Sequence, residues 1–226
     1  MDFKLVDIFF QIIVFLFAIS VHESAHAWMA NRCGDPTARM LGRITLNPIK
    51  HMDPFGTLLL PAIGLFSGAG LFGWAKPCPV TPQNFRSPVM GDILTTLAGP
   101  LSNFLMVVAA VVGLLLISLT TPVGSDIVHN LAHGAITNTG SALMPLIWLL
   151  YTAVYLNVLL GIFNLIPVPP LDGSHVLRHI LPAPARALYD RAGIVGLLLL
   201  FTVGGPLVRA VVRPVLRFVD ALLLKI

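Results

Sequence analysis

Three long apolar runs limit what this chain can fold into more than any other feature of its sequence. They lie at about Asp7 to Ala30, Met90 to Leu119 and Ser141 to Phe163. A transmembrane helix needs about 20 predominantly apolar residues, and each run is long enough. Charged residues make up only 11% of the chain, whereas a soluble domain carries about 25%. The sequence therefore predicts an all-α polytopic membrane protein, a bundle of transmembrane helices.

A fourth apolar stretch, from Thr57 to Phe72, is too short for a crossing and is interrupted by Pro61 and several glycines. Basic residues flank it on both sides, so we expect a re-entrant segment that dips into the membrane and returns. Irregular backbone at membrane depth must be buried in protein or line a cavity. Residues Arg39 to Pro48 and Ala75 to Val80 are candidates for two short paired strands beside it. We therefore expect a short re-entrant or β-hairpin element close to any functional site.

The first apolar run contains the sequence His22-Glu23-Ser24-Ala25-His26. Histidines four residues apart lie on one face of a helix, where both imidazoles can reach one Zn²⁺. The glutamate between them is then placed to act as a general base. The alternative is a histidine pair that is satisfied by hydrogen bonds between packed helices. Ionisable groups within a membrane span usually mark a functional site, which favours the metal.

A tetrahedral zinc site in a hydrolase has three protein ligands and one open position, so a third ligand is needed. The chain has few acidic candidates, because Glu23 is its only glutamate. Asp2 and Asp7 lie at the far end of the first run, and Asp126 lies in a polar loop. Asp172 follows a proline-rich stretch at the end of the third run, where prolines interrupt the helix and free polar groups to face a cavity. Asp172 is the candidate that this reasoning favours.

The distribution of basic residues predicts the orientation of the chain. Arginine and lysine occur in 32–50, 76–86 and 178–191, whereas 120–140 contains neither. By the positive-inside rule the three basic segments are cytoplasmic and the other is outside. The net charge of +4 is thus explained by topology. No basic run with interleaved aromatic residues is present, so nucleic acid is not expected as a partner.

Taken together, these motifs resemble the site-2 protease family of intramembrane zinc metalloproteases. The resemblance is carried by His-Glu-x-x-His, by Ala98-Gly99-Pro100-x-x-Asn103, and by Asn-x-x-Pro-x-x-Pro-x-Asp-Gly at 164–173. The segments His51-x-Asp53-Pro54-Phe55-Gly56 and Gly73-Trp74-Ala75-Lys76-Pro77 are similar to the compact bacterial branch, without PDZ or CBS domains. The resemblance implies His22, His26 and Asp172 as metal ligands, Glu23 as catalytic base, and Asn164 near the substrate or the oxyanion. It leaves the roles of Asn103, His51 and Asp53 open.

The resemblance also implies an activity and a location. The expected protein is an intramembrane zinc metalloendopeptidase with one Zn²⁺ per chain. It would cleave peptide bonds within or next to transmembrane segments of membrane-protein substrates, as in regulated intramembrane proteolysis. Its expected partners are a transmembrane protein or peptide and the lipid bilayer, in a bacterial inner membrane, with the active site opening to the cytoplasm. We expect one membrane-embedded domain over 1–226, with a catalytic core at about 7–180 and C-terminal helices at about 187–226.

Two other functions use the same residues. A membrane transporter could hold a metal with them, but transporters tend to contain paired repeats with matching broken helices, and the sequence shows none. A catalytically silent metal-binding membrane protein of this fold would be expected to lack the glutamate or a ligand, and all four residues are present.

Overall fold

The computed structural model describes residues 3–68, 71, 73–135, 140–203 and 205–225, and these residues form helices and connecting loops without a β-strand. The all-α prediction is confirmed. The helices are α1 (Phe3–Cys33), α2 (Thr37–Met40), α3 (Leu60–Ser67), α4 (Pro88–Thr120), α5 (Pro122–Ala132), α6 (Met144–Asn164), α7 (Gly173–Ile180), α8 (Ala183–Val203) and α9 (Gly205–Leu223).

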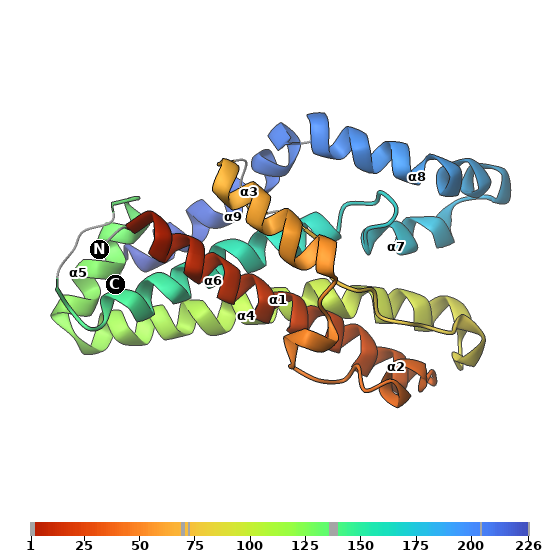
Figure 1. The fold of residues 1–226 in the computed structure, drawn as a ribbon, viewed down its shortest axis with the longest axis horizontal. Coiled ribbons are helices and arrows are strands. Elements are labelled where there is room, and N and C mark those ends of the chain that lie inside the picture. The colour runs from red at the N-terminus through yellow and green to blue at the C-terminus, as the bar shows by residue number, and fades with distance from the viewer. Residues whose placement is uncertain (1–2, 69–70, 72, 136–139, 204, 226) are drawn as a thin grey trace.

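Helices α1, α4 and α6 pack together and form the long axis of the molecule (Figure 1). Among the described residues, three helices are long and apolar enough to cross a membrane, and they match the three predicted runs: Lys4–Cys33, Pro88–Thr120 and Met144–Asn164. At 1.5 Å per residue each exceeds the roughly 30 Å of hydrocarbon in a bilayer. The chain is therefore built as an integral membrane protein.

The main apolar core lies at the end of the bundle where both chain termini are found (Figure 1). Leu114 of α4, Ile127 of α5, Ile147 of α6 and Leu223 of α9 are completely or almost completely buried there. Tyr151 adds a polar contact between α6 and α9 by donating a hydrogen bond to Asp220 (2.7 Å). This end is packed from four helices, which leaves the opposite end of α1 and α4 free to carry polar groups.

The apolar stretch between the first two long helices leaves the bundle and returns to the same place. It consists of a π-helical turn, Pro54–Leu59, and α3. The Trp74 amide donates to the Gly56 carbonyl (3.1 Å), and the Thr57 hydroxyl donates to the Trp74 carbonyl (2.7 Å). A Cβ atom at Gly73 would lie 2.2 Å from the Gly56 oxygen, so only glycine permits this approach. Both ends of the excursion are therefore fixed side by side, as a re-entrant segment requires.

The predicted pair of short strands does not form. Thr37–Met40 is a helical turn, Pro48–Lys50 is a 3₁₀ turn capped by Asn47, and the described residues of 73–81 are extended but unpaired in a ladder. Prolines at 77, 79 and 82 remove the amide donors that a ladder would need. The two segments are connected instead by a backbone hydrogen bond from the Lys76 amide to the His51 carbonyl (2.8 Å) and by the Arg43 side chain, which donates to the carbonyls of Lys76 and Pro77.

Asp35 joins the end of α1 to the loop that leads into α4. Its buried carboxylate accepts hydrogen bonds from the amide and hydroxyl of Thr37, the amide of Thr81 and the side-chain amide of Asn84. Burial by itself raises the pKa of a carboxyl group, but these donors outweigh it and lower the pKa of Asp35 below its ordinary value. The ionised Asp35 thus fixes α1 and α4 relative to each other at this end of the bundle.

Candidate metal centre

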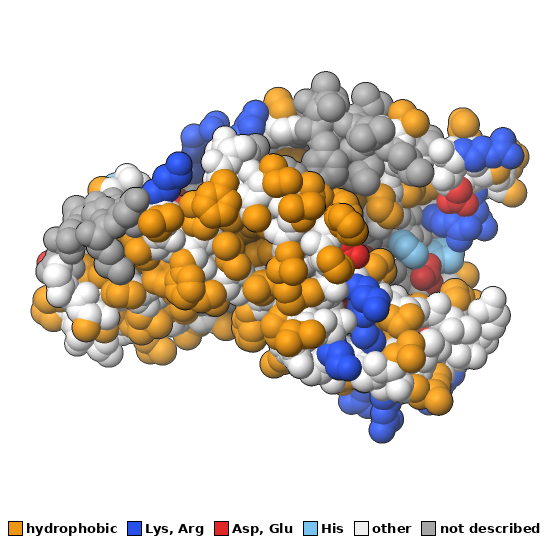
Figure 2. Space-filling model, viewed as in Figure 1, with side chains coloured by type: hydrophobic (Ala, Val, Ile, Leu, Met, Phe, Trp, Pro, Cys, Tyr) orange, Lys and Arg blue, Asp and Glu red, His pale blue; other side chains and the backbone are white. Residues whose placement is uncertain are grey.

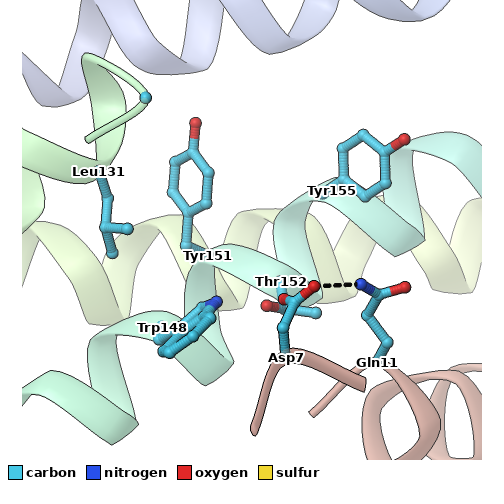
Figure 3. A pocket seen from close by; sticks show the side chains of 8 residues that line it. Asp7, Gln11, Leu131, Trp148, Tyr151, Thr152 and Tyr155 are labelled. Carbon is cyan, nitrogen blue, oxygen red and sulfur yellow. Dashed lines mark hydrogen bonds between the residues drawn. The ribbon is translucent and has the colours of Figure 1, made fainter. Parts of the chain in front are cut away.

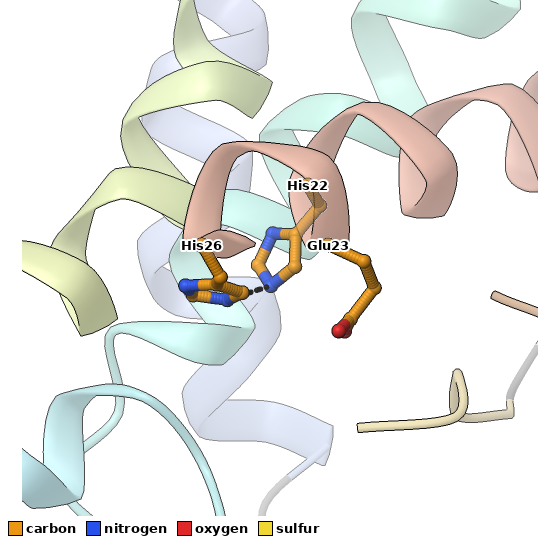
Figure 4. A group of neighbouring side chains, drawn as sticks. All are labelled: His22, Glu23 and His26. Carbon is orange, nitrogen blue, oxygen red and sulfur yellow. Dashed lines mark hydrogen bonds between the residues drawn. The ribbon is translucent and has the colours of Figure 1, made fainter. Parts of the chain in front are cut away.

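His22 and His26 point to the same side of α1, with Glu23 beside them (Figure 4). All three side chains are buried. The Nε2 atoms of the two histidines are 3.0 Å apart, and the two rings are nearly perpendicular. The helical spacing therefore brings the imidazoles together as the sequence predicts.

The other nitrogen of each ring contacts an oxygen of α4. The His26 Nδ1 is 2.7 Å from the Thr95 carbonyl oxygen, and a carbonyl can only accept a hydrogen bond. The His22 Nδ1 is 2.7 Å from the Asn103 Oδ1. Thr95 contributes only its backbone carbonyl, so no side-chain motif in the sequence predicts this contact.

The orientation of the Asn103 amide is fixed by a chain of hydrogen bonds. Its Nδ2 donates to the Asn157 Oδ1 (2.8 Å), and the Asn157 Nδ2 donates to the Ala153 carbonyl of α6 (2.9 Å). Because the last acceptor is a backbone carbonyl, each amide in the chain can satisfy its neighbour in one orientation only. Asn103 therefore presents oxygen to His22, and both histidines carry their proton on Nδ1.

This assignment leaves two unprotonated Nε2 atoms facing each other at 3.0 Å. The Asp172 Oδ2 lies 3.2 Å from the His22 Nε2 and 3.5 Å from the His26 Nε2. The Asp172 Oδ2 and the Glu23 Oε2 are buried and have no hydrogen-bond partner among the described residues. Three electron-pair donors thus converge on one point, an arrangement that a bound cation would stabilise.

The spacing of these three atoms fits zinc. Bonds of about 2.0 Å in a tetrahedron place neighbouring ligand atoms about 3.3 Å apart. The three measured separations, 3.0, 3.2 and 3.5 Å, bracket that value. Imidazole nitrogen and carboxylate oxygen are ordinary zinc ligands, and histidines bound to zinc usually donate their second N–H to an oxygen, as both do here.

Gly99 gives a steric reason for the Ala-Gly-Pro motif. A Cβ atom at this position would lie 2.4 Å from the His26 Nε2 and 2.7 Å from the His22 Cε1. The motif therefore brings α4 close to both rings, and its Asn103 contacts one of them.

Arg43 is a buried charge beside the site that sequence reasoning used only for topology. One of its guanidinium nitrogens, Nη2, lies 4.0 Å from the Glu23 Oε2 and donates to the carbonyls of Lys76 and Pro77. Its side chain is almost inaccessible to solvent. Arg43 therefore links Glu23 to the extended segment after α3. No spacing in the sequence predicts this contact between residues 20 positions apart.

Three other predicted residues contact their own segments. The Asn164 amide donates to the Leu160 carbonyl one turn earlier in α6 (3.0 Å). His51 is fully buried, with its Nε2 2.8 Å from the Thr45 carbonyl. The Asp53 carboxylate caps the π-helical turn by accepting from the amides of Phe55 and Gly56. These hydrogen bonds hold the loop and the end of α6, rather than the histidine pair.

The histidine pair lies away from a cavity of about 300 Å³ at the other end of α1 and α6 (Figure 3). That cavity contains none of the predicted site residues, and its walls include Asp7, Gln11, Trp148, Tyr151 and Tyr155. On the visible face of the space-filling view, histidine and acidic side chains gather instead in a hollow at the end that carries α7 (Figure 2). The polar chemistry of the molecule is thus concentrated at the end opposite the apolar core.

Comparisons with known proteins agree with this site. The model of peptidase family M50 matches residues 10–203. The "Putative zinc metalloprotease YwhC" of Bacillus subtilis is 36% identical over 211 residues, which cover 92% of this chain and 86% of the relative. The "Putative zinc metalloprotease Rip2" of Mycolicibacterium smegmatis is 31% identical over 186 residues, covering 81% of this chain and 62% of the relative. No solved structure matches the chain.

The family match covers most of the chain and includes all of the converging residues, from His22 on α1 to Asp172 before α7. The buried donor set independently fits the metal that the names of these relatives specify. This chain belongs to peptidase family M50, the site-2 protease family, and is a zinc-dependent peptidase.

Proposed function

We propose that this chain is an intramembrane endopeptidase, which cleaves peptide bonds within or next to transmembrane segments of other membrane proteins, as in regulated intramembrane proteolysis. The observation that carries the proposal is the position of the donor set. His22 and His26 lie within a helix that is long and apolar enough to span the bilayer, and both are buried against a second such helix. A peptide bond that reaches them must itself enter the bundle at membrane depth.

In this proposal His22, His26 and Asp172 hold the zinc, and Glu23 is the catalytic base. Zinc, when bound, supplies a Lewis acid that polarises a carbonyl and makes water more acidic. The Glu23 carboxylate takes a proton from the attacking water and later delivers it to the leaving amine. Its Oε2 is free of hydrogen bonds among the described residues, so its lone pairs are open to a proton.

A helical substrate must unwind locally, since its carbonyls are otherwise bonded to amides four residues later. Asn164 is proposed to donate to the oxyanion that develops on the scissile carbonyl. Its side-chain amide has two N–H donors, and the bond to the Leu160 carbonyl uses only one of them. The gain is then realised only in the transition state, so Asn164→Ala is expected to lower kcat more than it raises KM.

The proposed entry to the site is from the cytoplasm. Arg32 lies in the last turn of α1 and marks the cytoplasmic edge of that span. His26 precedes it by six residues and His22 by ten, so they lie roughly 9 and 15 Å below this edge in an upright helix. The segment that contains α3 begins and ends at the same place, where Trp74 contacts Gly56. This suits a re-entrant segment that separates lipid from a water-filled entry.

The decisive experiment compares Glu23→Gln with the wild type, both purified in detergent. We expect the variant to retain zinc, because Glu23 is not one of the proposed ligands, and to lose cleavage of a transmembrane peptide by about 10³-fold or more. Asp190→Asn, which removes an exposed carboxylate on α8, serves as a control and should match the wild type. Retained cleavage in Glu23→Gln would overturn the assignment of the base.

The orientation is tested separately in sealed vesicles. A membrane-impermeant chelator should inactivate the enzyme much faster in inside-out vesicles than in right-side-out ones. Equal rates, or faster inactivation in right-side-out vesicles, would contradict a cytoplasmic opening.

A further inference from the structure

A second polar cluster lies between α4 and α7, outside the donor set described above. The Asp92 carboxylate of α4 is 2.7 Å from the His179 Nε2 and 3.1 Å from the His175 Nδ1, both on α7. The two histidines are four residues apart, so they form one face of this helix and both contact the same carboxylate. The side chain of Asp92 is largely buried, with 17% of its surface exposed.

Apolar packing holds α7 only loosely. Its buried residues are Gly173 and Ser174, the two at its first turn. A cavity of about 330 Å³ has walls from Leu97 of α4 and from Val176 and Ile180 of α7, where a packed interface would have side-chain contacts. The hydrogen bonds that His175 and His179 donate to Asp92 are the polar connection that the described residues show between α7 and α4. The bond to Asp92 raises the pKa of His175 above its ordinary value.

The position of α7 matters because Asp172 immediately precedes it. On α4, Asp92 lies one turn before Thr95, whose carbonyl accepts from His26. Residues three apart share a face of the helix. A single turn of α4 thus contacts both helices that bring ligands to the site. Thr95 contacts His26 of α1, and Asp92 contacts α7, which Asp172 precedes.

We propose that Asp92 is a positioning residue of the zinc site, which fixes Asp172 relative to His22 and His26 by binding both His175 and His179 on α7. This inference rests on the proposed role of Asp172 as a ligand. It assigns to α4 the function of a template that aligns ligands from two separate helices. Loss of Asp92 frees α7 to shift over the cavity beneath it, and the third ligand shifts with it.

The test measures zinc retention rather than proteolysis. Purified holoenzyme in detergent is mixed with excess chromogenic chelator, and the rate of zinc transfer is recorded. We expect Asp92→Asn to release zinc about 10-fold faster than wild type or more, within the 10–100-fold range typical of residues that orient metal ligands. Asp190→Asn is the matched control, because it removes the carboxylate that binds Arg178 of α7 from α8 rather than from α4. It should release zinc at the wild-type rate.

A double-mutant cycle separates positioning from general loss of structure. In a His175→Gln/His179→Gln background, Asp92→Asn should change the release rate by less than about 2-fold, because its partners are already absent. An equally large effect in both backgrounds would overturn the inference, as would Asp92→Asn behaving like Asp190→Asn. Failure of the proposed ligand set looks different, since Asp172→Ala would then keep its zinc whatever Asp92 does.

Discussion

Two histidine pairs in this protein share a spacing and differ in what they contact. His22 and His26 on α1 and His175 and His179 on α7 are both four residues apart, and each pair lies beside an aspartate. In the α1 pair the Nδ1 atoms donate to oxygens of α4, so both Nε2 atoms present lone pairs to Asp172. In the α7 pair each histidine donates directly to the Asp92 carboxylate.

The comparison shows that the second nitrogen of each ring decides the chemistry. In the α1 pair each Nδ1 donates to a neutral oxygen, which leaves each Nε2 with a lone pair for a metal. In the α7 pair no neutral acceptor among the described residues holds the other ring nitrogen, and each histidine pairs with the Asp92 carboxylate. Burial adds to the difference, because the α1 pair is buried whereas the His175 side chain is 46% exposed. A spacing of four residues is thus compatible with either role and does not by itself select one.

The largest expected difference between the pairs is in metal content. His26→Ala and Asp172→Ala should each reduce bound zinc from about one per chain to nearly none, because two ligands hold zinc far less tightly than three. His179→Ala removes one of the two α7 contacts to Asp92 rather than a ligand, so it should retain far more zinc than either of these variants. Metal analysis of the purified variants measures this, and undiminished zinc in Asp172→Ala would move the third ligand elsewhere.

A methyl group beside the α1 pair should also disrupt it. Gly99→Ala places a Cβ atom 2.4 Å from the His26 Nε2, so α1 and α4 must separate. We expect zinc retention to fall by about 100-fold, since a misplaced ligand cannot be replaced by another residue nearby. Gly113→Ala on the same helix is the control, because its Cβ would meet only the flexible Leu150 side chain at 3.3 Å. Equal retention in the two variants would show that the contact at Gly99 can relax.

Removing the oxygen that orients His22 should have an intermediate effect. Asn103→Leu deprives the His22 Nδ1 of its acceptor and should weaken zinc binding about 10- to 100-fold. Asn157→Ala leaves that acceptor in place and removes only its support, so its effect should be smaller. Zinc titrations measure both. If Asn157→Ala weakened binding more than Asn103→Leu, the proposed order of the network would be wrong.

The α7 pair should show the smallest effect, as a pH dependence. The bond to Asp92 raises the native pKa of His175 above 6.5. A raised native pKa contributes stability that is fully present below the unfolded value and is lost as pH rises through the native value. Asp172 and Arg178 also face His175 with opposing effects. We expect the NMR titration midpoint of His175 to fall in Asp92→Asn. An unchanged midpoint would show that the bond is absent in solution.

Much of this site could be predicted because it consists of rare side chains in a chain with few charges. Glu23 is the only glutamate, and Asp172 stands out by its place among prolines. The contributions of Thr95 and Arg43 could not be predicted. Thr95 acts through a carbonyl that any residue would supply, and Arg43 reaches Glu23 only because the intervening loop folds back.

In the fold, too, some elements could be predicted from the sequence and others could not. The long helices follow from apolar length, which a bilayer enforces strongly. The strands expected at Arg39 to Pro48 and Ala75 to Val80 do not form, because local caps and prolines outweigh a weak alternation of apolar residues. Side-chain capping by Asn47 and Asp53 acts within a few residues and offers the backbone local partners in place of a strand ladder.

Asp35 determines where the end of α1 lies relative to α4. It fixes the end of α1 to the loop before α4, and His26 lies seven residues before Cys33, the last residue of α1, a distance of about 10 Å. Adding one residue to α1 between them would shift His26 by about 1.5 Å and turn it by about 100°. Its Nδ1 would then face away from Thr95, with every ligand residue still present. The length of chain between His26 and Asp35 is therefore as much a part of the metal site as the histidine itself.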